Sequence, residues 1–167
     1  VTRRGDATGI SRDQLEAALD SLRGQIQQVP PLYSALKHQG KPLYQLARAG
    51  IAFEPKSRPV TIHKLELIDW QPPLVTLEVV CSKGTYIRSL AHDLGRILGC
   101  GAHLKSLIRL RCGIFDIKDA VSVPQLEDAF RSGYWQQFLY PIDSVLSDLA
   151  AVVVSDDEAK NIRNGRS

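Results

Sequence analysis

Residues 74–98, LVTLEVVCSKGTYIRSLAHDLGRIL, contain the most informative pattern of the sequence, because they predict a strand, a turn and a helix in immediate succession. Apolar and polar side chains alternate over residues 75–81, which is typical of a half-buried strand. Gly84 permits a tight turn, and Thr85 can cap the helix that follows. Apolar residues recur at helical spacing in the rest of the stretch, which predicts that one face of the helix is buried.

A second predicted strand, over residues 58–70, precedes this stretch. Its apolar pairs, Val60 with Ile62 and Leu65 with Leu67, fall on opposite faces of an ideal strand, so a bulge is predicted between them. A Gln-Pro-Pro turn joins this strand to the next one. The two strands are therefore expected to form an antiparallel pair.

Further elements follow from capping boxes and hydrophobic periodicity. We predict a helix after Ser11, a short strand over residues 25–29, a strand region over 104–117, a helix after Ser122, and a Val-rich strand followed by an acidic helix from about Ala150. The fold class is α+β, with a mixed, largely antiparallel sheet flanked by helices.

Residues 31–59 differ in kind from their surroundings, because they combine prolines, a glycine turn and a short helical pattern. The helix is predicted from Pro42 to Arg48, with Gly50 after its end. Connections of this length are usually functional. We interpret the segment as a long ordered excursion that carries one helix.

Composition excludes several classes of protein. The chain has 167 residues, of which 44% are hydrophobic and 23% charged, which fits one globular domain and not a disordered chain. The sequence predicts neither a membrane-spanning run nor an apolar signal segment. Its three cysteines lack Cys-x-x-Cys spacing, which argues against a disulfide framework and a zinc knuckle. A cytoplasmic location is expected.

Charge is distributed in blocks. Residues 31–111 carry twelve basic and five acidic side chains, whereas residues 112–167 carry five basic and nine acidic ones. A basic block beside an acidic one indicates a localised face that binds a polyanion such as nucleic acid. Ordinary clustering on a solvated surface is the alternative.

The junction between the second strand and its helix holds the densest chemistry. Lys83, Tyr86 and Arg88 surround a turn whose backbone N–H groups are free to meet an anion. The guanidinium of Arg88 is permanently charged and shaped for a carboxylate or a phosphate. A structural role, with Tyr86 in the core and Arg88 paired to a nearby acid, stays open. The spacing of a phosphate-binding P-loop is absent.

Three blocks of sequence resemble a known family in their order and spacing. They are KGTYIRSL (83–90) with DLG (93–95), YSALK (33–37) with GK (40–41), and AHL (102–104) with the residues after it. Across roughly residues 5–145 the chain resembles the TruB family of tRNA pseudouridine synthases, and 31–59 matches the thumb loop of that family.

The resemblance implies an isomerase that converts uridine-55 in the TΨC loop of tRNA to pseudouridine. The base is detached from its ribose, rotated and reattached through carbon, after it has left the stack. Neither a cofactor nor a metal is implied. The TΨC arm of tRNA is the expected partner.

Roles of individual residues follow from the same resemblance. Arg88 matches the arginine that pairs with the catalytic Asp, Tyr86 matches a tyrosine beside that pair, and Leu107 matches an apolar residue that packs on the target base. Lys83 is a candidate for substrate binding. The candidate RNA contacts are Lys37, Lys41, Arg48, Tyr33, Tyr44, Arg109 and Arg111. Loop packing remains the alternative for the two tyrosines, and a solvated strand face for the last two arginines.

The catalytic Asp of the family lies in a Gly-Thr-Leu-Asp-Pro segment, which this sequence lacks. Asp20 is the one Asp that follows a Leu, and Ser21 stands after it instead of Pro. Together with the absence of Met, this predicts an excerpt that is inactive without the preceding half of a monomeric enzyme. Residues 1–148 would belong to the catalytic domain, and 149–167 would begin a C-terminal RNA-binding domain.

Two other functions stay open. The Gly-Thr-Tyr-Ile-Arg block also resembles the guide-RNA-dependent catalytic subunit of archaea and eukaryotes, although the thumb-like stretch favours the bacterial type. The basic block would equally serve a non-catalytic RNA-binding module.

Overall fold

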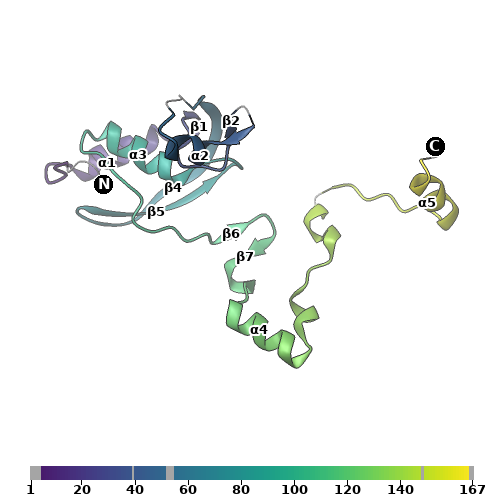
Figure 1. Ribbon diagram of the computed structural model, residues 1–167. Helices are drawn as coiled ribbons and strands as arrows, with labels where there is room; N and C mark the ends of the chain where they lie inside the picture. Colours follow the sequence, from purple (N-terminus) through teal and green to yellow (C-terminus); the bar gives the residue numbers. More distant parts are fainter. Residues whose placement is uncertain (1–4, 39, 52–54, 148, 166–167) are drawn as a thin grey trace. The chain divides into compact units, whose positions relative to one another are not determined.

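The computed structural model describes residues 5–38, 40–51, 55–147 and 149–165. The chain divides into two compact units, residues 1–107 and 108–167, and each is described by itself (Figure 1). The elements of the first unit are α1 (Arg12–Asp20), β1 (Gly24–Gln28), β2 (Lys37–His38), β3 (Lys41–Pro42), α2 (Leu43–Arg48), β4 (Arg58–Gln71), β5 (Leu74–Cys81) and α3 (Ile87–Ile97).

The central sheet of the first unit has three strands in the order β1-β4-β5, and both pairings are antiparallel. Gly24 lies opposite Ile62 in the β1–β4 pair, and Leu65 lies opposite Val79 in the β4–β5 pair. This confirms the predicted α+β class with a largely antiparallel sheet, and it confirms the expected pairing of β4 with β5.

The bulge predicted in β4 is present. The β4–β5 register shifts between Ile62 and Lys64. An extra residue at this point turns the following side chains over, so Val60, Ile62 and Leu65 are all buried on the core side. A second shift, between Leu67 and Asp69, was not expected from the sequence.

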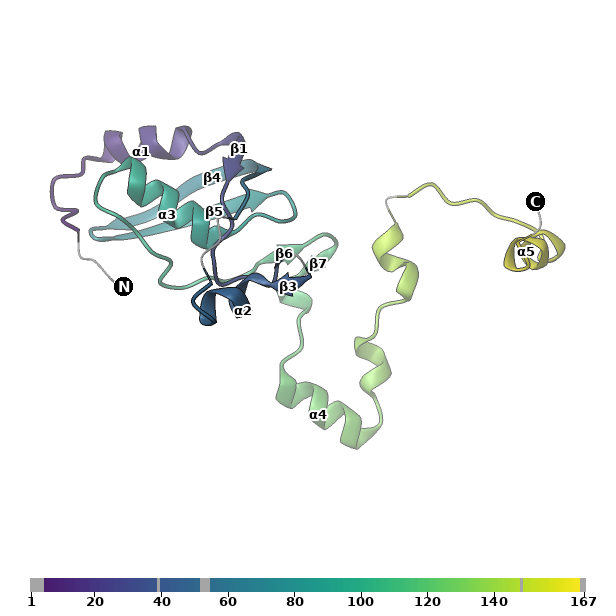
Figure 2. The same cartoon turned by 45° about the horizontal axis from the view of Figure 1, so that its top comes forward.

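Helices α1 and α3 cover the same face of the sheet (Figure 2). Both helices place apolar residues at a spacing of three and four toward β4. The buried core they form with the sheet consists of Leu15, Ala18, Leu19, Leu22, Ile62, Leu65, Leu90 and Leu94. Helix α1 begins at the predicted capping box, in which Ser11 and Gln14 bind each other's backbone N–H.

The start of α3 differs from the prediction by one residue. Tyr86, not Thr85, is the N-cap, and its side chain makes no capping hydrogen bond. The Thr85 hydroxyl instead donates to the backbone oxygen of Ser82, 2.9 Å away, inside the turn. Gly84 adopts a φ of 83°, which explains why a glycine occupies this turn.

The excursion over residues 31–59 contains the predicted helix as α2 and also a β2–β3 hairpin that the sequence did not indicate. Backbone hydrogen bonds from Leu43 to Leu36 and from Tyr44 to Ser34 close it into a small folded loop. Leu43 and Leu46, both on α2, are the buried residues of its helix. Residues 39 and 52–54 of the predicted thumb lie outside the described residues.

The second unit consists of short elements. These are β6 (Arg111–Cys112), β7 (Phe115–Asp116), the 3-10 helices η1 (Ile117–Asp119), η2 (Trp135–Phe138) and η3 (Ile142–Leu146), and the helices α4 (Val123–Ser132) and α5 (Asp156–Arg163). The predicted capping box at Ser122 starts α4, which confirms that helix.

One strand prediction is confirmed only in part, and another is wrong. The region 104–117 contains only the two-residue strands β6 and β7, because Gly113, with a φ of 58°, lies in the turn that reverses the chain between them. The Val-rich segment at 151–154 forms no strand, and Val153 is 97% exposed. An alternating or β-branched pattern becomes a strand only where a partner strand supplies hydrogen bonds. The acidic helix after it is present as α5.

Among the described residues, no helix is long and apolar enough to cross a membrane. The predicted domain division at 148–149 stays a prediction, and residue 148 itself lies outside the described part of the chain.

Candidate functional site

The first turn of α3 positions the two residues predicted to take part in catalysis. Strand β5 ends at Cys81, and the five residues 82–86, which include the Ser82–Thr85 turn, bring the chain into α3. Tyr86 is half-buried at the N-cap, and Arg88 is exposed two positions later. The predicted strand-to-helix junction is therefore present, with both side chains at one end of the helix.

Among the described residues, Arg88 makes one side-chain hydrogen bond, and it also lines a hollow. Its Nη2 donates to the backbone oxygen of Tyr33, 3.0 Å away, at the start of the excursion. The guanidinium also lines a hollow of about 350 Å³ together with His92, Ala102, His103 and Leu104. A guanidinium has several N–H donors, so one bond to a carbonyl leaves an edge free for an anion.

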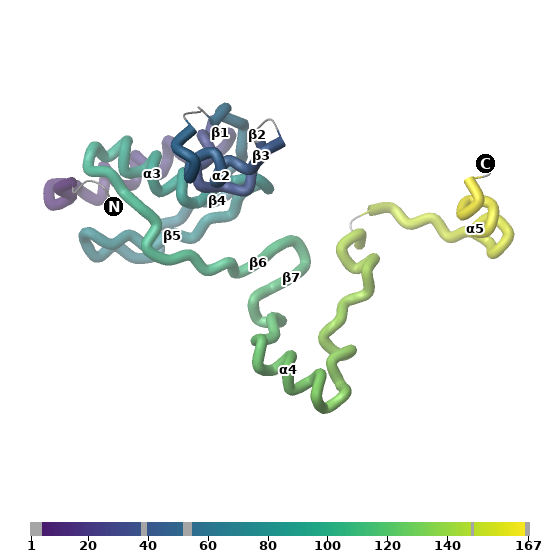
Figure 3. Tube along the Cα trace, in the orientation of Figure 1, coloured from purple at the N-terminus to yellow at the C-terminus, as the bar shows by residue number. Residues whose placement is uncertain are grey.

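Close packing between α3 and the chain that follows it shapes this hollow. The chain leaves α3 and passes through residues 98–104, which can be followed in Figure 3. The N–H of Gly101 donates to the Gly95 oxygen over 2.9 Å. A Cβ at position 95 would lie 2.0 Å from the Ala102 nitrogen, so only glycine permits this approach. The segment that carries His103 is thus held directly against the helix that carries Arg88.

Two buried polar residues connect the start of α3 to the end of β1 and to the residue that follows it. Gln28 is 1% exposed, and its Oε1 accepts the N–H of Tyr86 over 2.7 Å. Ser89 is 7% exposed, and its Oγ donates to the Val29 oxygen over 2.7 Å. Our reading of the sequence did not single out either residue. The one indication in the sequence was that Gln28 stands at a predicted strand position, where a buried side chain is usually apolar.

The excursion brings together the residues predicted to contact RNA there. Lys37 and Lys41 are exposed on the β2–β3 hairpin. On α2, the Arg48 guanidinium lies over the Tyr44 ring at 5.7 Å from its centre, which is a cation–π contact. Tyr33 is 57% exposed at the base of the loop. The two tyrosines therefore differ: Tyr44 partly packs within the loop, whereas most of Tyr33 is free.

The remaining predicted residues are distributed between the units. Lys83 is exposed in the turn before α3, and Leu107 is 60% exposed at the last position of the first unit. Arg109 and Arg111 are exposed residues of the second unit, and only Arg111 belongs to a strand. We predicted that both arginines lie on one face of a strand. This is wrong for Arg109, because the chain has no regular secondary structure at that residue. Arg111 Nε donates to the Gly113 oxygen over 3.2 Å.

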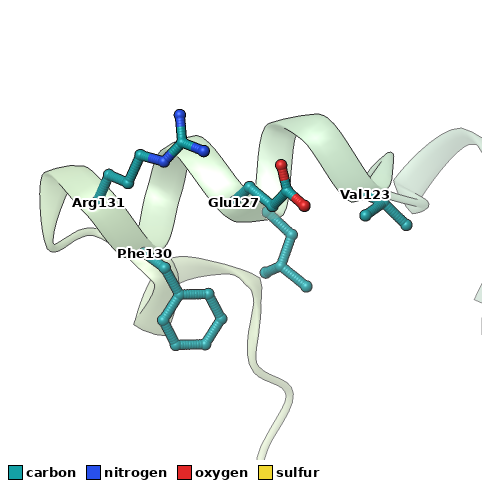
Figure 4. A pocket seen from close by; sticks show the side chains of 5 residues that line it. Val123, Glu127, Phe130 and Arg131 are labelled. Carbon is teal, nitrogen blue, oxygen red and sulfur yellow. The ribbon is translucent and has the colours of Figure 1, made fainter.

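The second unit has a hollow of its own, of about 480 Å³, along α4. Its lining is mainly apolar, from Val123, Leu126 and Phe130, and Phe130 stacks on Trp135 at a ring separation of 5.1 Å. Glu127 and Arg131 also line the hollow, and Figure 4 shows the Arg131 side chain extending from the helix away from the Phe130 ring, with Glu127 in front of the helix. This hollow lies on an amphipathic helix, and its described lining residues do not include a hydroxyl or thiol nucleophile or a histidine.

Within the described part of the chain, no three His, Cys, Asp or Glu side chains are grouped so as to hold a metal ion. The groups that the α3 site does offer are a guanidinium, two imidazoles and a tyrosine. Such a set binds and orients an anionic or hydrogen-bond-accepting partner.

Two family models match the chain and between them cover most of it. The model described as TruB family pseudouridylate synthase (N terminal domain) matches residues 1–87. The model described as tRNA pseudouridylate synthase B C-terminal domain matches residues 88–147.

Curated relatives agree with these models. The tRNA pseudouridine synthase B of Pseudomonas aeruginosa (strain UCBPP-PA14) is 46% identical over an alignment of 171 positions, which covers 95% of this chain and 56% of that protein. The tRNA pseudouridine synthase B of Aromatoleum aromaticum is 44% identical over an alignment of 174 positions, which covers 99% of this chain and 56% of that protein. The chain thus spans a little over half the length of these relatives.

Among solved structures, a Cbf5-Nop10-Gar1 complex contains a chain that matches with a TM-score of 0.74 and 26% identity, over 98% of this chain and 46% of that one. A structure of an H/ACA RNP bound to a substrate RNA containing 2'-deoxyuridine shares the fold, with a TM-score of 0.62 and 21% identity, over 84% of this chain and 38% of that one. The model that matches residues 1–87 covers more than half of the sequence. The chain belongs to the TruB family of pseudouridylate synthases.

Proposed function

We propose that this chain is part of a tRNA pseudouridine synthase that isomerises uridine-55 in the TΨC loop, with Arg88 as the residue that holds the catalytic carboxylate. Curated relatives that bear the name tRNA pseudouridine synthase B support the activity. The observation that carries the role of Arg88 is its exposed side chain at a hollow, where its one side-chain hydrogen bond to a described residue goes to the Tyr33 oxygen.

The reaction moves the ribose from nitrogen to carbon on one base. The bond between C1' and N1 breaks, a bond between C1' and C5 forms, C5 loses its proton, and the former N1 gains one. The essential Asp would come from polypeptide outside these 167 residues. A carboxylate enclosed with the base is costly unless it is paired, and pairing with Arg88 would keep it ionised near neutral pH.

Other residues would hold the substrate. Tyr86 stands beside Arg88 at the start of α3. Leu107 would pack on the base that has left the stack. The Lys37 and Lys41 ammonium groups on the β2–β3 hairpin would meet RNA phosphates, and the exposed Tyr33 ring would stack or pack against RNA.

The test uses a hybrid protein, in which this chain is joined to the parts of the Pseudomonas aeruginosa relative that lie outside the match. The substrate is a TΨC stem-loop with tritium at C5 of the target uridine, because tritium is released only when C5 gives up its hydrogen. We expect the hybrid protein to release tritium without any guide RNA. A requirement for guide RNA would favour the guide-dependent alternative, and binding without turnover would favour a non-catalytic RNA-binding module.

Replacing Arg88 by Ala in the hybrid protein is expected to lower turnover by roughly a hundredfold or more, since it removes a charged donor from the reacting group. Stem-loop binding should change little, because RNA affinity comes mainly from phosphate contacts elsewhere. Arg88→Lys should also have low turnover, because an ammonium group cannot make the bidentate contact with a carboxylate that a guanidinium makes.

Arg96→Ala is the matched control, because Arg96 is an exposed arginine on the same helix whose nearest charged partner is Asp93, 3.9 Å away. It should keep normal turnover. Normal turnover by Arg88→Ala would refute the assigned role, and turnover by the 167 residues alone would refute the need for an Asp from outside them.

A further inference from the structure

We propose that Gln28 is a positioning residue, which fixes the first turn of α3 and hence the placement of Tyr86 and Arg88. The inference rests on the proposed function, since it concerns how that site is held. It is carried by a hydrogen bond that joins residues far apart in the sequence: Gln28 Oε1 accepts the Tyr86 N–H over 2.7 Å.

The start of α3 differs from the starts of α1, α4 and α5. Each of those helices has a Ser at the N-cap whose N–H is accepted by the side chain three residues later, and these side chains are Gln14, Gln125 and Glu158. At α3 the N-cap is Tyr86, which has no such local partner, and Gln28 from β1 accepts its N–H instead. The acceptor that normally belongs to the helix is supplied here by the sheet.

The residue that would have closed a local capping box is used differently. Ser89 stands three positions after the N-cap, and its Oγ donates to the Val29 oxygen over 2.7 Å. Arg88 lies between these two contacts and donates to the Tyr33 oxygen over 3.0 Å. Three hydrogen bonds thus tie one helix turn to residues 28–33, which lead from β1 into the excursion.

Stability alone does not account for a glutamine at this position. Among the described residues, its Nε2 has no hydrogen-bond partner, although the side chain is 1% exposed. A buried unpaired donor lowers the stability of the folded state. What the glutamine gains is an acceptor that reaches the N-cap of α3, and this favours a role in placing that helix.

The geometric part of the inference can be tested on the 167-residue chain itself. In Gln28→Met, a variant of similar length without the acceptor, hydrogen exchange at the Tyr86 amide should accelerate by about tenfold. Gln28→Glu keeps an acceptor oxygen and should keep slow exchange. Ser21→Ala is the matched control, because it deletes a hydrogen bond of the same length, to the Ala18 oxygen at the end of α1.

The functional part uses the hybrid protein defined above, at a temperature where circular dichroism shows equal folding of all variants. Gln28→Met should lower kcat by roughly tenfold to a hundredfold, because displacement of a reacting group by about 1 Å is enough for such losses. KM for the stem-loop should stay nearly unchanged, and Gln28→Glu should restore most of kcat. A residue that only stabilised the fold would not separate kcat from KM in proteins that are equally folded.

The outcomes separate the two proposals. An active wild-type hybrid in which Gln28→Met has normal kcat, or a raised KM alone, overturns the positioning role and leaves the proposed function intact. Unchanged exchange at the Tyr86 amide in Gln28→Met also overturns it. An inactive wild-type hybrid contradicts the proposed function and, with it, the role that rests on it.

Discussion

Helix α1 of the first unit and helix α4 of the second begin with the same local motif but differ in what they pack against. Helices α1 and α4 each start at a Ser that closes a capping box with a Gln three residues later. In the first unit α1 packs on a sheet, whereas in the described part of the second unit Ala129 is the one buried residue. Local signals therefore define where a helix starts, while a shared core decides whether elements unfold together.

The largest expected difference between the units concerns apolar truncation. Leu19 is fully buried, so Leu19→Ala should lower the free energy of unfolding by about 2–5 kcal/mol. Ile142 is 93% exposed, and Ile142→Ala should change it by about 0.5 kcal/mol or less. Urea unfolding followed through Trp70 in a Trp135→Phe background reports on the first unit alone.

The comparison would fail if Ile142→Ala shifted the urea midpoint as far as Leu19→Ala does. That outcome would mean that the second unit contributes to the core of the first one in solution.

Removing the caps gives a smaller and sharper contrast. Ser11→Ala should cost about 1 kcal/mol and move the urea midpoint seen by Trp70, because α1 unfolds with its core. Ser122→Ala removes the same kind of cap from α4 and should lower helix content by circular dichroism without moving that midpoint. The Gly variants are the matched controls, since Gly at an N-cap costs only a few tenths of a kcal/mol. Equal shifts for both Ala variants would remove the distinction between the units.

The smallest expected effect is on the pH dependence of α5. The Ser155 hydroxyl, and then the Ser155 N–H, hold the pKa of Glu158 below its ordinary value. A carboxyl whose pKa is lower in the folded state stabilises that state above the unfolded pKa, and this contribution is lost as the pH falls through the folded pKa. The helix content of α5 should therefore decline under acid conditions.

An NMR titration of the Glu158 carboxyl checks this, and Ser155→Ala should return its pKa toward the ordinary value. A Glu158 pKa that stays equally low in Ser155→Ala would show that another group, such as the helix N-terminus itself, is the cause.

The elements that the sequence predicted correctly depend on neighbours along the chain. The capping boxes at Ser11 and Ser122 and the bulge after Ile62 are written in a few consecutive residues. The strand region predicted over residues 104–117 is present only as the short pair β6 and β7, because the chain turns back at Gly113 and pairs with itself. Whether a pattern finds its partner is not a local property.

The sequence predicted the polar and charged residues of the candidate site but not the hydrogen bond that holds them in place. The placement of Tyr86 and Arg88 at a strand-to-helix junction followed from one stretch of sequence, as did the exposed Lys83. Gln28 lies fifty-eight residues before Tyr86, and no spacing rule connects the two. The contact exists only because β1 and α3 meet in the folded unit, so tertiary structure had to be known before its role could be inferred.

The missing side chain at Gly95 has a consequence for how the hollow beside Arg88 can vary. The backbone of residues 101–102 occupies the space that a side chain at position 95 would need. No side chain of Gly95 therefore separates α3 from this segment. The separation of α3 from this segment is thereby set by main-chain atoms, while the chemical character of the hollow comes from lining residues such as His92, His103 and Leu104. Substitutions at those three positions can alter which functional groups the hollow prefers without moving α3 away from the segment that follows it.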